Sequence, residues 1–300
     1  MKSIRMLALA WLCLLAQPAL AALNILACTP EWGSLSKELG GDKVNVYVAT
    51  TALQDPHHIE ARPSLIAQAR RADLMVCTGA ELEVGWVPLL QTQSGNSKIQ
   101  TGQPGYFEAA RNVVLLEIPE RVDRALGDVH PQGNPHVHLD PRNIAKIAAA
   151  LSERMSKLDP PESAYYRERA KSFLQRWQDA TTLWEKEAAP LKGLPLVVYH
   201  KDLSYLISWI GMREVGSLEP LPGMPPTTSH LSELLARLTK DPAKVVVRSA
   251  YNDPRAAEFL AERAKIPAVV LPFTVGGTDK AKDLFGLYDD TLTRLLSVAK

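Results

Sequence analysis

Hydrophobic residues occur along the chain in two alternating patterns. Short runs at residues 25–28, 74–77 and 196–199 are apolar throughout, as expected for strands of a parallel sheet that is covered on both faces. Between such runs lie segments whose apolar residues recur every three or four positions, which predicts helices. The repeated exchange of strand for helix predicts an α/β fold with mainly parallel sheets.

One helical pattern is much longer than the others. Residues 162–188 contain neither Pro nor Gly, and their apolar residues keep helical spacing throughout. At 1.5 Å per residue this helix would be about 40 Å long. Strand-like runs lie on both sides of it in the sequence. We therefore expect two α/β lobes, residues 22–158 and 193–300, joined by one long helix within residues 159–192.

The first 21 residues predict export. Lys2 and Arg5 precede an apolar run, and Ala19 and Ala21 have the small-x-small spacing of a cleavage site. The run is too short to span a membrane. We therefore expect residues 1–21 to be a cleaved signal peptide. Because no Cys stands at the cleavage point, we do not expect a lipid anchor.

Charge and cysteine content narrow the function further. The formal net charge is +1, or about −1 without the signal peptide, and the chain has no basic cluster, so nucleic acid is not an expected partner. Cys28 and Cys77 remain after cleavage, and both end strand-like runs. They could pair in an oxidising compartment if the strands are neighbours. Two small buried side chains are the alternative.

Five of the seven histidines fall in three short segments, at His57 and His58, His136 and His138, and His200. Imidazole is the commonest protein ligand for metals of the zinc type. His57 lies in a proline-stiffened loop after a strand, and His200 ends a strand, where ligands bind in open α/β sheets. His58 faces away if His57 faces inward. Three imidazoles brought together would leave one tetrahedral position to fill.

Two nearby histidines have alternative interpretations. His136 and His138 could both face one metal on an extended segment, or one could be a ligand and the other a packing residue. His130 stands in a loop rich in Gly, Pro and Asp. We interpret that loop as a solvated turn rather than as a source of ligands.

The histidine segments lie in motifs that resemble the periplasmic solute-binding proteins of zinc and manganese ABC importers. The resemblance covers essentially the whole chain after the signal peptide, and these stretches carry it: Asp55-Pro56-His57, Gly79-Ala80-Glu81-Leu82-Glu83 and Pro135-His136-Val137-His138-Leu139-Asp140-Pro141. It implies a metal site in the cleft between two lobes, with His57, His136 and His200 as ligands. His138 stands where members usually carry Trp, which favours the packing alternative.

The resemblance leaves the fourth ligand open. Many members supply a carboxylate after a strand of the second lobe, and neither usual carboxylate is present at its position in this chain. The loop that follows the last strand contains Gly276, Gly277 and Asp279. We expect Asp279 to be the fourth ligand, with Asp253, Asp202 or water as alternatives.

Together these observations predict a protein that is not an enzyme. Three imidazoles favour Zn²⁺ over Mn²⁺, which prefers oxygen-rich sites, although copper binds such sites at least as tightly. The resemblance implies a periplasmic protein that delivers Zn²⁺ to an ABC permease in the inner membrane. We expect a monomer, with a periplasmic metallochaperone as a second candidate partner.

Two other functions remain as alternatives. One is a protein of the same type that binds Mn²⁺ or another divalent metal. The other is a hydrolase with an open three-histidine zinc, which would need a general base near the histidines. Glu60 is the best candidate for that base, and the resemblance gives it a structural role instead.

Overall fold

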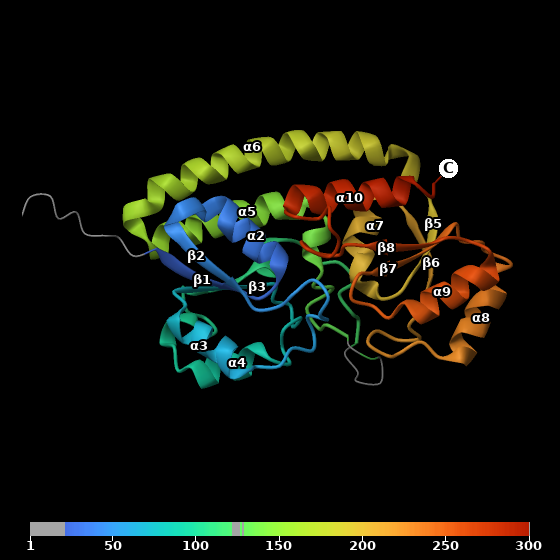
Figure 1. Ribbon diagram of the computed structural model, residues 1–300, viewed down its shortest axis with the longest axis horizontal. Helices are drawn as coiled ribbons and strands as arrows, with labels where there is room; N and C mark the ends of the chain where they lie inside the picture. Colours follow the sequence, from blue (N-terminus) through green and yellow to red (C-terminus); the bar gives the residue numbers. More distant parts are fainter. Residues whose placement is uncertain (1–21, 122–126, 128, 300) are drawn as a thin grey trace, which may run out of the picture.

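The computed structural model describes residues 22–121, 127 and 129–299 (Figure 1). The expected signal peptide lies outside these residues. Two α/β halves lie side by side, and the long helix α6 (Ser163–Ala188) runs across both of them. In the part of the chain that is described, no helix is both long enough and apolar enough to cross a membrane.

The N-terminal half is built on a four-stranded parallel sheet in the order β2-β1-β3-β4. Its strands are β1 (Leu23–Ala27), β2 (Val44–Val48), β3 (Leu74–Cys77) and β4 (Tyr106–Glu108). Helices α2 (Pro30–Gly40) and α5 (Pro141–Leu158) cover one face, and α3 (Pro63–Arg71) and α4 (Val87–Ser94) cover the other. The apolar runs 25–27 of β1 and 74–77 of β3 are therefore buried on both sides, as the sequence predicts.

The C-terminal half repeats this arrangement, with a parallel sheet in the order β6-β5-β7-β8. Its strands are β5 (Pro195–Val198), β6 (Arg213–Ser217), β7 (Val245–Ser249) and β8 (Ala268–Leu271). Helices α7 (Ser204–Ile210) and α10 (Leu284–Leu296) lie on one face, and α8 (Thr228–Leu238) and α9 (Pro254–Ala264) lie on the other.

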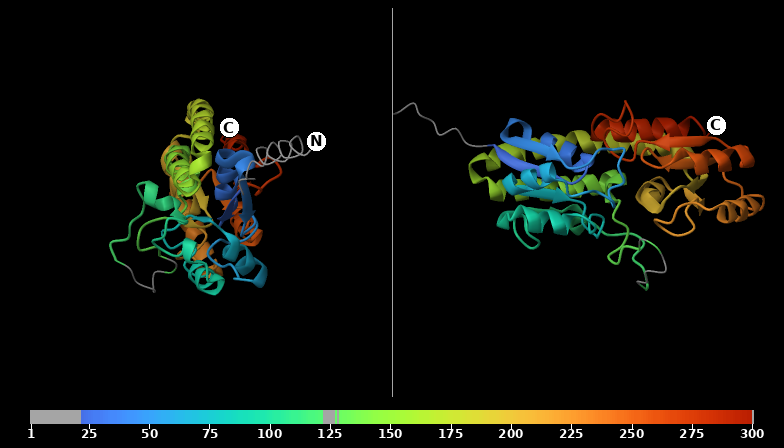
Figure 2. Two further views of the ribbon diagram at one scale, coloured as in Figure 1. Left: turned by 90° about the vertical axis from the view of Figure 1, so that its left-hand side faces the viewer. Right: turned by 60° about the horizontal axis from the view of Figure 1, so that its bottom comes forward.

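Helix α6 belongs to the core of both halves. It packs on α2 and α5 of the first half and on α10 of the second. Its buried stripe includes Phe173, Trp177 and Trp184, which continue one hydrophobic cluster from one sheet to the other. Seen along the molecule, α6 lies at the top and the blue-green helices α3 and α4 lie at the bottom (Figure 2, left). The predicted fold class is confirmed: two lobes with parallel sheets, joined by a long helix.

Cys28 and Cys77 form a disulfide. Cys28 directly follows β1, and Cys77 ends β3, the strand that pairs with β1. Of the two alternatives for these cysteines, a disulfide or two separate buried side chains, the structure has the disulfide, because the two strands are neighbours. Both residues are fully buried, so the bond lies inside the N-terminal half.

Candidate metal centre

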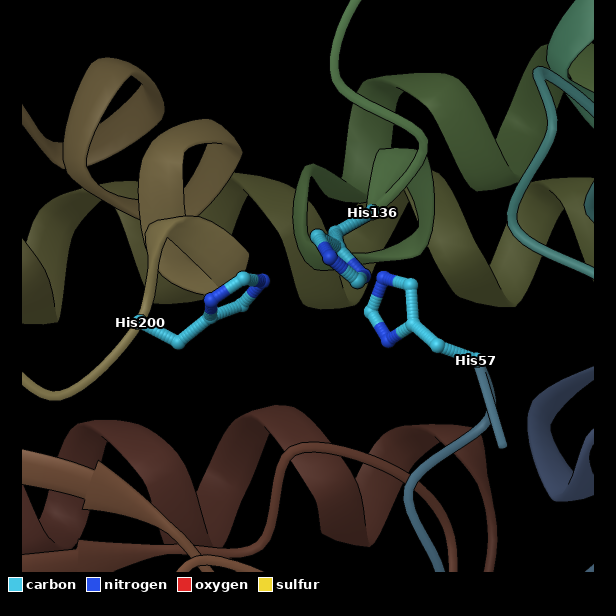
Figure 3. A group of neighbouring side chains, drawn as sticks. All are labelled: His57, His136 and His200. Atoms are coloured by element: carbon cyan, nitrogen blue, oxygen red, sulfur yellow. The ribbon is translucent and has the colours of Figure 1, made fainter. Parts of the chain in front are cut away.

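The structure brings His57, His136 and His200 together from three separate loops, with their rings pointing toward one another (Figure 3). One ligand nitrogen from each residue lies within 4.8 Å of the other two. The ring centroids are 5.5 Å apart for His57 and His136, 5.6 Å for His57 and His200, and 5.8 Å for His136 and His200. The first two residues belong to the N-terminal half and the third to the C-terminal half.

Asp55 holds the ring of His57 in place. Its Oδ1 accepts a hydrogen bond from the backbone N–H of His57 at 3.0 Å and another from ring Nδ1 at 2.6 Å. The indole N–H of Trp86 donates to the carbonyl of Pro56 at 3.0 Å and anchors the loop to the body of the lobe. Burial alone would raise the pKa of Asp55, but the hydrogen bonds and charge of His57 lower it below its ordinary value.

Glu219 holds the ring of His200, which follows β5, as Asp55 holds that of His57. The Nδ1 of His200 donates to Oε2 of Glu219 at 2.6 Å. Burial alone would lower the pKa of His200, but the hydrogen bond to Glu219 and nearby carboxylates raise it above its ordinary value. A carboxylate on Nδ1 fixes the tautomer of each ring and leaves Nε2 as the nitrogen available to a metal.

His136 differs from the other two because neither of its ring nitrogens has a hydrogen-bond partner among the described residues. The residue is only 1% exposed, and a buried polar group left without a partner costs about 1–3 kcal/mol. Burial, followed by the charges of His57 and His200, holds the pKa of His136 well below its ordinary value. The ring is therefore neutral and has a free lone pair, which fits a metal ligand.

Among the described residues, none of the carboxylates considered for the fourth position belongs to the group of three histidines. Asp279 is exposed and does not belong to the group of three. Asp253 caps helix α9. Asp202 is buried and accepts hydrogen bonds from the hydroxyls of Ser249 and Tyr251, and burial raises its pKa. The role of Asp279 as fourth ligand stays a prediction.

His138 lies outside the group, as the packing alternative requires. The Nε2 of His138 donates to the carbonyl of Phe273 at 2.9 Å. The backbone carbonyl of His138 accepts a hydrogen bond from the hydroxyl of Tyr288 at 2.6 Å. Its Nδ1 lies 3.8 Å from Oε1 of Glu31. These contacts place the ring between the two halves, where it holds the C-terminal half against the N-terminal half.

Sequence reasoning missed His130. Its Nε2 lies 3.3 Å from Nε2 of His57, and the two rings stack with centroids 5.3 Å apart. Burial, followed by the charges of His57 and His200, lowers the pKa of His130 to about 3. The sequence favoured a solvated turn over a source of ligands for this loop, whereas in the structure His130 is half-buried with its ring against that of His57. The only signal for it in the sequence was its position six residues before His136.

Comparison with known proteins gives the family. The family described as "ZnuA: Zinc-uptake complex component A periplasmic" matches residues 25–298. The "High-affinity zinc uptake system protein ZnuA" of Bacillus subtilis (strain 168) is 24% identical over 270 residues, which are 88% of this chain and 82% of that protein. The "Manganese ABC transporter substrate-binding lipoprotein scaA" of Streptococcus gordonii is 24% identical over 272 residues, which are 87% and 83% of the two chains.

Solved structures share the fold. A crystal structure of ZnuA superimposes with a TM-score of 0.75 at 19% identity and covers 91% of this chain and 99% of that one. A manganese-bound periplasmic metal-binding protein from candidatus liberibacter asiaticus gives a TM-score of 0.75 at 15% identity. The chain belongs to the ZnuA family of periplasmic metal-binding proteins, which are the non-enzymatic solute-binding components of ABC importers for divalent metals.

Proposed function

We propose that this protein captures Zn²⁺ in the periplasm through His57, His136 and His200 and delivers it to an ABC permease in the inner membrane. The observation that carries the proposal is the buried ring of His136, whose two nitrogens have no partner among the described residues. It faces two further imidazoles whose tautomers are set by carboxylates. A bound cation would satisfy the lone pair that the fold leaves unsatisfied.

The donor set supports zinc rather than manganese. The group consists of three nitrogens, whereas Mn²⁺ prefers carboxylate, carbonyl and water oxygens. The names of the relatives do not decide the question, because they include both zinc and manganese proteins. Copper would bind this site at least as tightly, so selection of zinc in the cell depends on which metal is available.

The charges around the site suit a divalent ion. Asp55 and Glu219 each contact the far side of a ligand ring, so two carboxylates stand just outside the three imidazoles. Such outer carboxylates raise the basicity of the ligands and typically contribute 10–100-fold to metal affinity. The metal can therefore be held with little net charge left in a buried position.

We assign release to the segment 272–277, which touches both halves. Phe273 has a left-handed φ of 63° and packs edge-on against the ring of His136, with centroids 5.5 Å apart. The hydroxyl of Thr274 donates to buried Glu31 of the N-terminal half at 2.6 Å. A displacement of this segment removes support from His136, and Gly276 and Gly277 give it the freedom to move.

Calorimetric titration with Zn²⁺ tests the ligand assignment. We expect His57→Ala, His136→Ala and His200→Ala each to lose at least about 100-fold in affinity, since each removes a ligand rather than an outer partner. His230→Ala is the matched control, because that ring bonds the carbonyl of Ser217 instead. Unchanged affinity in all three variants contradicts the proposal.

The same titration with Mn²⁺ tests the choice of metal, and Asp279→Ala tests the predicted fourth ligand.

For export, we propose a cleaved signal peptide without a lipid anchor, although the relative from Streptococcus gordonii is named a lipoprotein. The intact mass of the exported protein distinguishes a free N-terminus from an acylated one.

A further inference from the structure

The spacing between His57 and His130 matches that of two ligands on one metal ion. Their Nε2 atoms lie 3.3 Å apart. With zinc–nitrogen bonds of about 2.0–2.1 Å in a tetrahedron, two ligand nitrogens are separated by about 3.3–3.4 Å. The Nε2 of His57 is also the nitrogen left available by the hydrogen bond from Nδ1 to Asp55. The two rings therefore present the atoms that could share an ion.

His130 borders the group of three histidines, with its ring centroid 5.3 Å from that of His57 and 6.5 Å from that of His136. It lines a cavity of about 260 Å³ together with His136 and His200. On its other side it lines a second cavity of about 170 Å³ together with His57 and His58. His130 is thus the histidine that borders both cavities.

The carboxylate of Glu117, which lines the larger cavity, is already engaged by other groups. Its oxygens accept hydrogen bonds from Asn134 and Ser204, each at 2.8 Å, and lie 3.7 Å from the ammonium of Lys201. Ligation by Glu117 would break these contacts. Among the described residues, the printed contacts of His130 are with two rings of the site itself, those of His57 and His136, and a shared metal would replace the contact with His57.

We propose that His130, in place of the Asp279 expected from the sequence, is the fourth ligand and completes a four-imidazole site over His57, His136 and His200; this rests on the proposed function. His130 is not in the group whose ligand nitrogens all lie within 4.8 Å of one another, so capture draws its ring inward. It is thus the outermost ligand, the last to bind and the first to leave. A fourth nitrogen also strengthens the preference for zinc over manganese.

X-ray absorption spectroscopy of the zinc-loaded protein tests this directly, because imidazole rings give a characteristic outer-shell signal that can be counted. We expect four imidazoles in the unaltered protein and three in His130→Ala, with water in the vacated position. We also expect zinc to dissociate at least about tenfold faster from that variant. His130→Gln repeats the test with a polar side chain, and circular dichroism checks that both variants fold.

His58→Ala is the matched control, because it removes a neighbouring imidazole from the same cavity and should leave four imidazoles on the metal. Three imidazoles in the unaltered protein, unchanged in His130→Ala, overturn the inference while leaving the proposed function in place. Loss of an oxygen ligand in Asp279→Ala would likewise give the fourth position to that carboxylate. Failure of the unaltered protein to bind zinc at all would overturn both proposals.

Discussion

The carboxylates beside His57 and His200 decide which nitrogen each ring presents to the cleft. Asp55 and Glu219 each accept from Nδ1 at 2.6 Å. The carboxylate of Glu219 stabilises the protonated as well as the neutral ring of His200, so it affects the competition between proton and metal. The pKa of His200 is raised although burial opposes the rise.

Glu219→Gln should extend metal binding to lower pH. At and below the raised pKa of His200 a proton occupies the ring and must leave before a metal binds, so affinity falls as pH decreases through that pKa. Removing the charge of Glu219 lowers the pKa, and the fall then begins at lower pH. Gln can still accept from Nδ1, although affinity at high pH should decrease about tenfold.

The measurement is zinc affinity of both proteins across pH 5 to 8, by competition with a chelator of known pH dependence. A midpoint that stays in place or moves to higher pH would show that Glu219 does not control the protonation of His200. Glu233→Gln, an exposed residue on α8, serves as a control for the loss of one negative charge.

At the residue scale, the family resemblance implied His57, His136 and His200 as one group, and the structure brings their rings together. The strand pattern supported this for His57 and His200, because each follows a strand. His130 was missed because its loop composition is typical of a turn and its position depends on the fold of both halves. The loop with Asp279 could not be placed from sequence for the same reason. Its backbone is set by contacts such as Thr274 with Glu31, which are 243 residues apart.

At the element scale, apolar runs predicted β1, β3 and β5, whereas no sequence pattern indicated the edge strands β4 and β6. The apolar runs in β1, β3 and β5 predict strands that are buried on both faces of their sheets. The strand β4 has only three residues, and β6 contains Arg213, Glu214 and Gly216 and is mostly half-exposed. Edge strands bury less, so their sequences retain polar residues that hide the pattern.

The apolar stripe of α6 should contribute strongly to stability. Trp184 is 1% exposed, stacks on Tyr288 with centroids 4.8 Å apart, and its indole N–H donates to Asp289 at 2.7 Å. Trp184→Ala should lower the free energy of unfolding by about 3–5 kcal/mol, because it removes a large buried ring between the helix and α10.

Leu183→Ala is the matched control on the same helix. That side chain is 53% exposed, and we expect a change within about 0.5 kcal/mol. Denaturant unfolding followed by circular dichroism measures both variants. Equal stabilities would mean that α6 is a spacer and not a part of the core.

At the scale of the whole molecule, the disulfide ties together the two central strands of the N-terminal sheet. Cys28 and Cys77 are 49 residues apart, and closing a loop of this length stabilises the folded state by about 4 kcal/mol in the chain-entropy account. The double variant Cys28→Ala/Cys77→Ala should lose up to about that much free energy of unfolding.

Denaturant unfolding of that double variant and of the oxidised protein measures the loss in free energy of unfolding. Zinc affinity is the second readout, and we expect it to change less than tenfold, because neither Cys belongs to the group of three histidines. A folded variant that loses zinc binding would show that the disulfide also shapes the site.

One hydrophobic cluster continues through α6 from one sheet to the other. This cluster limits how far the structure can change when the metal ion binds. A wide hinge opening would have to separate packed aromatic rings such as Trp177 and Phe285, whose centroids are 4.9 Å apart. Capture and release of the ion are therefore expected to change a few loops and leave the outline of the molecule almost unaltered. A permease that distinguishes the loaded from the empty carrier has only that local difference to recognise.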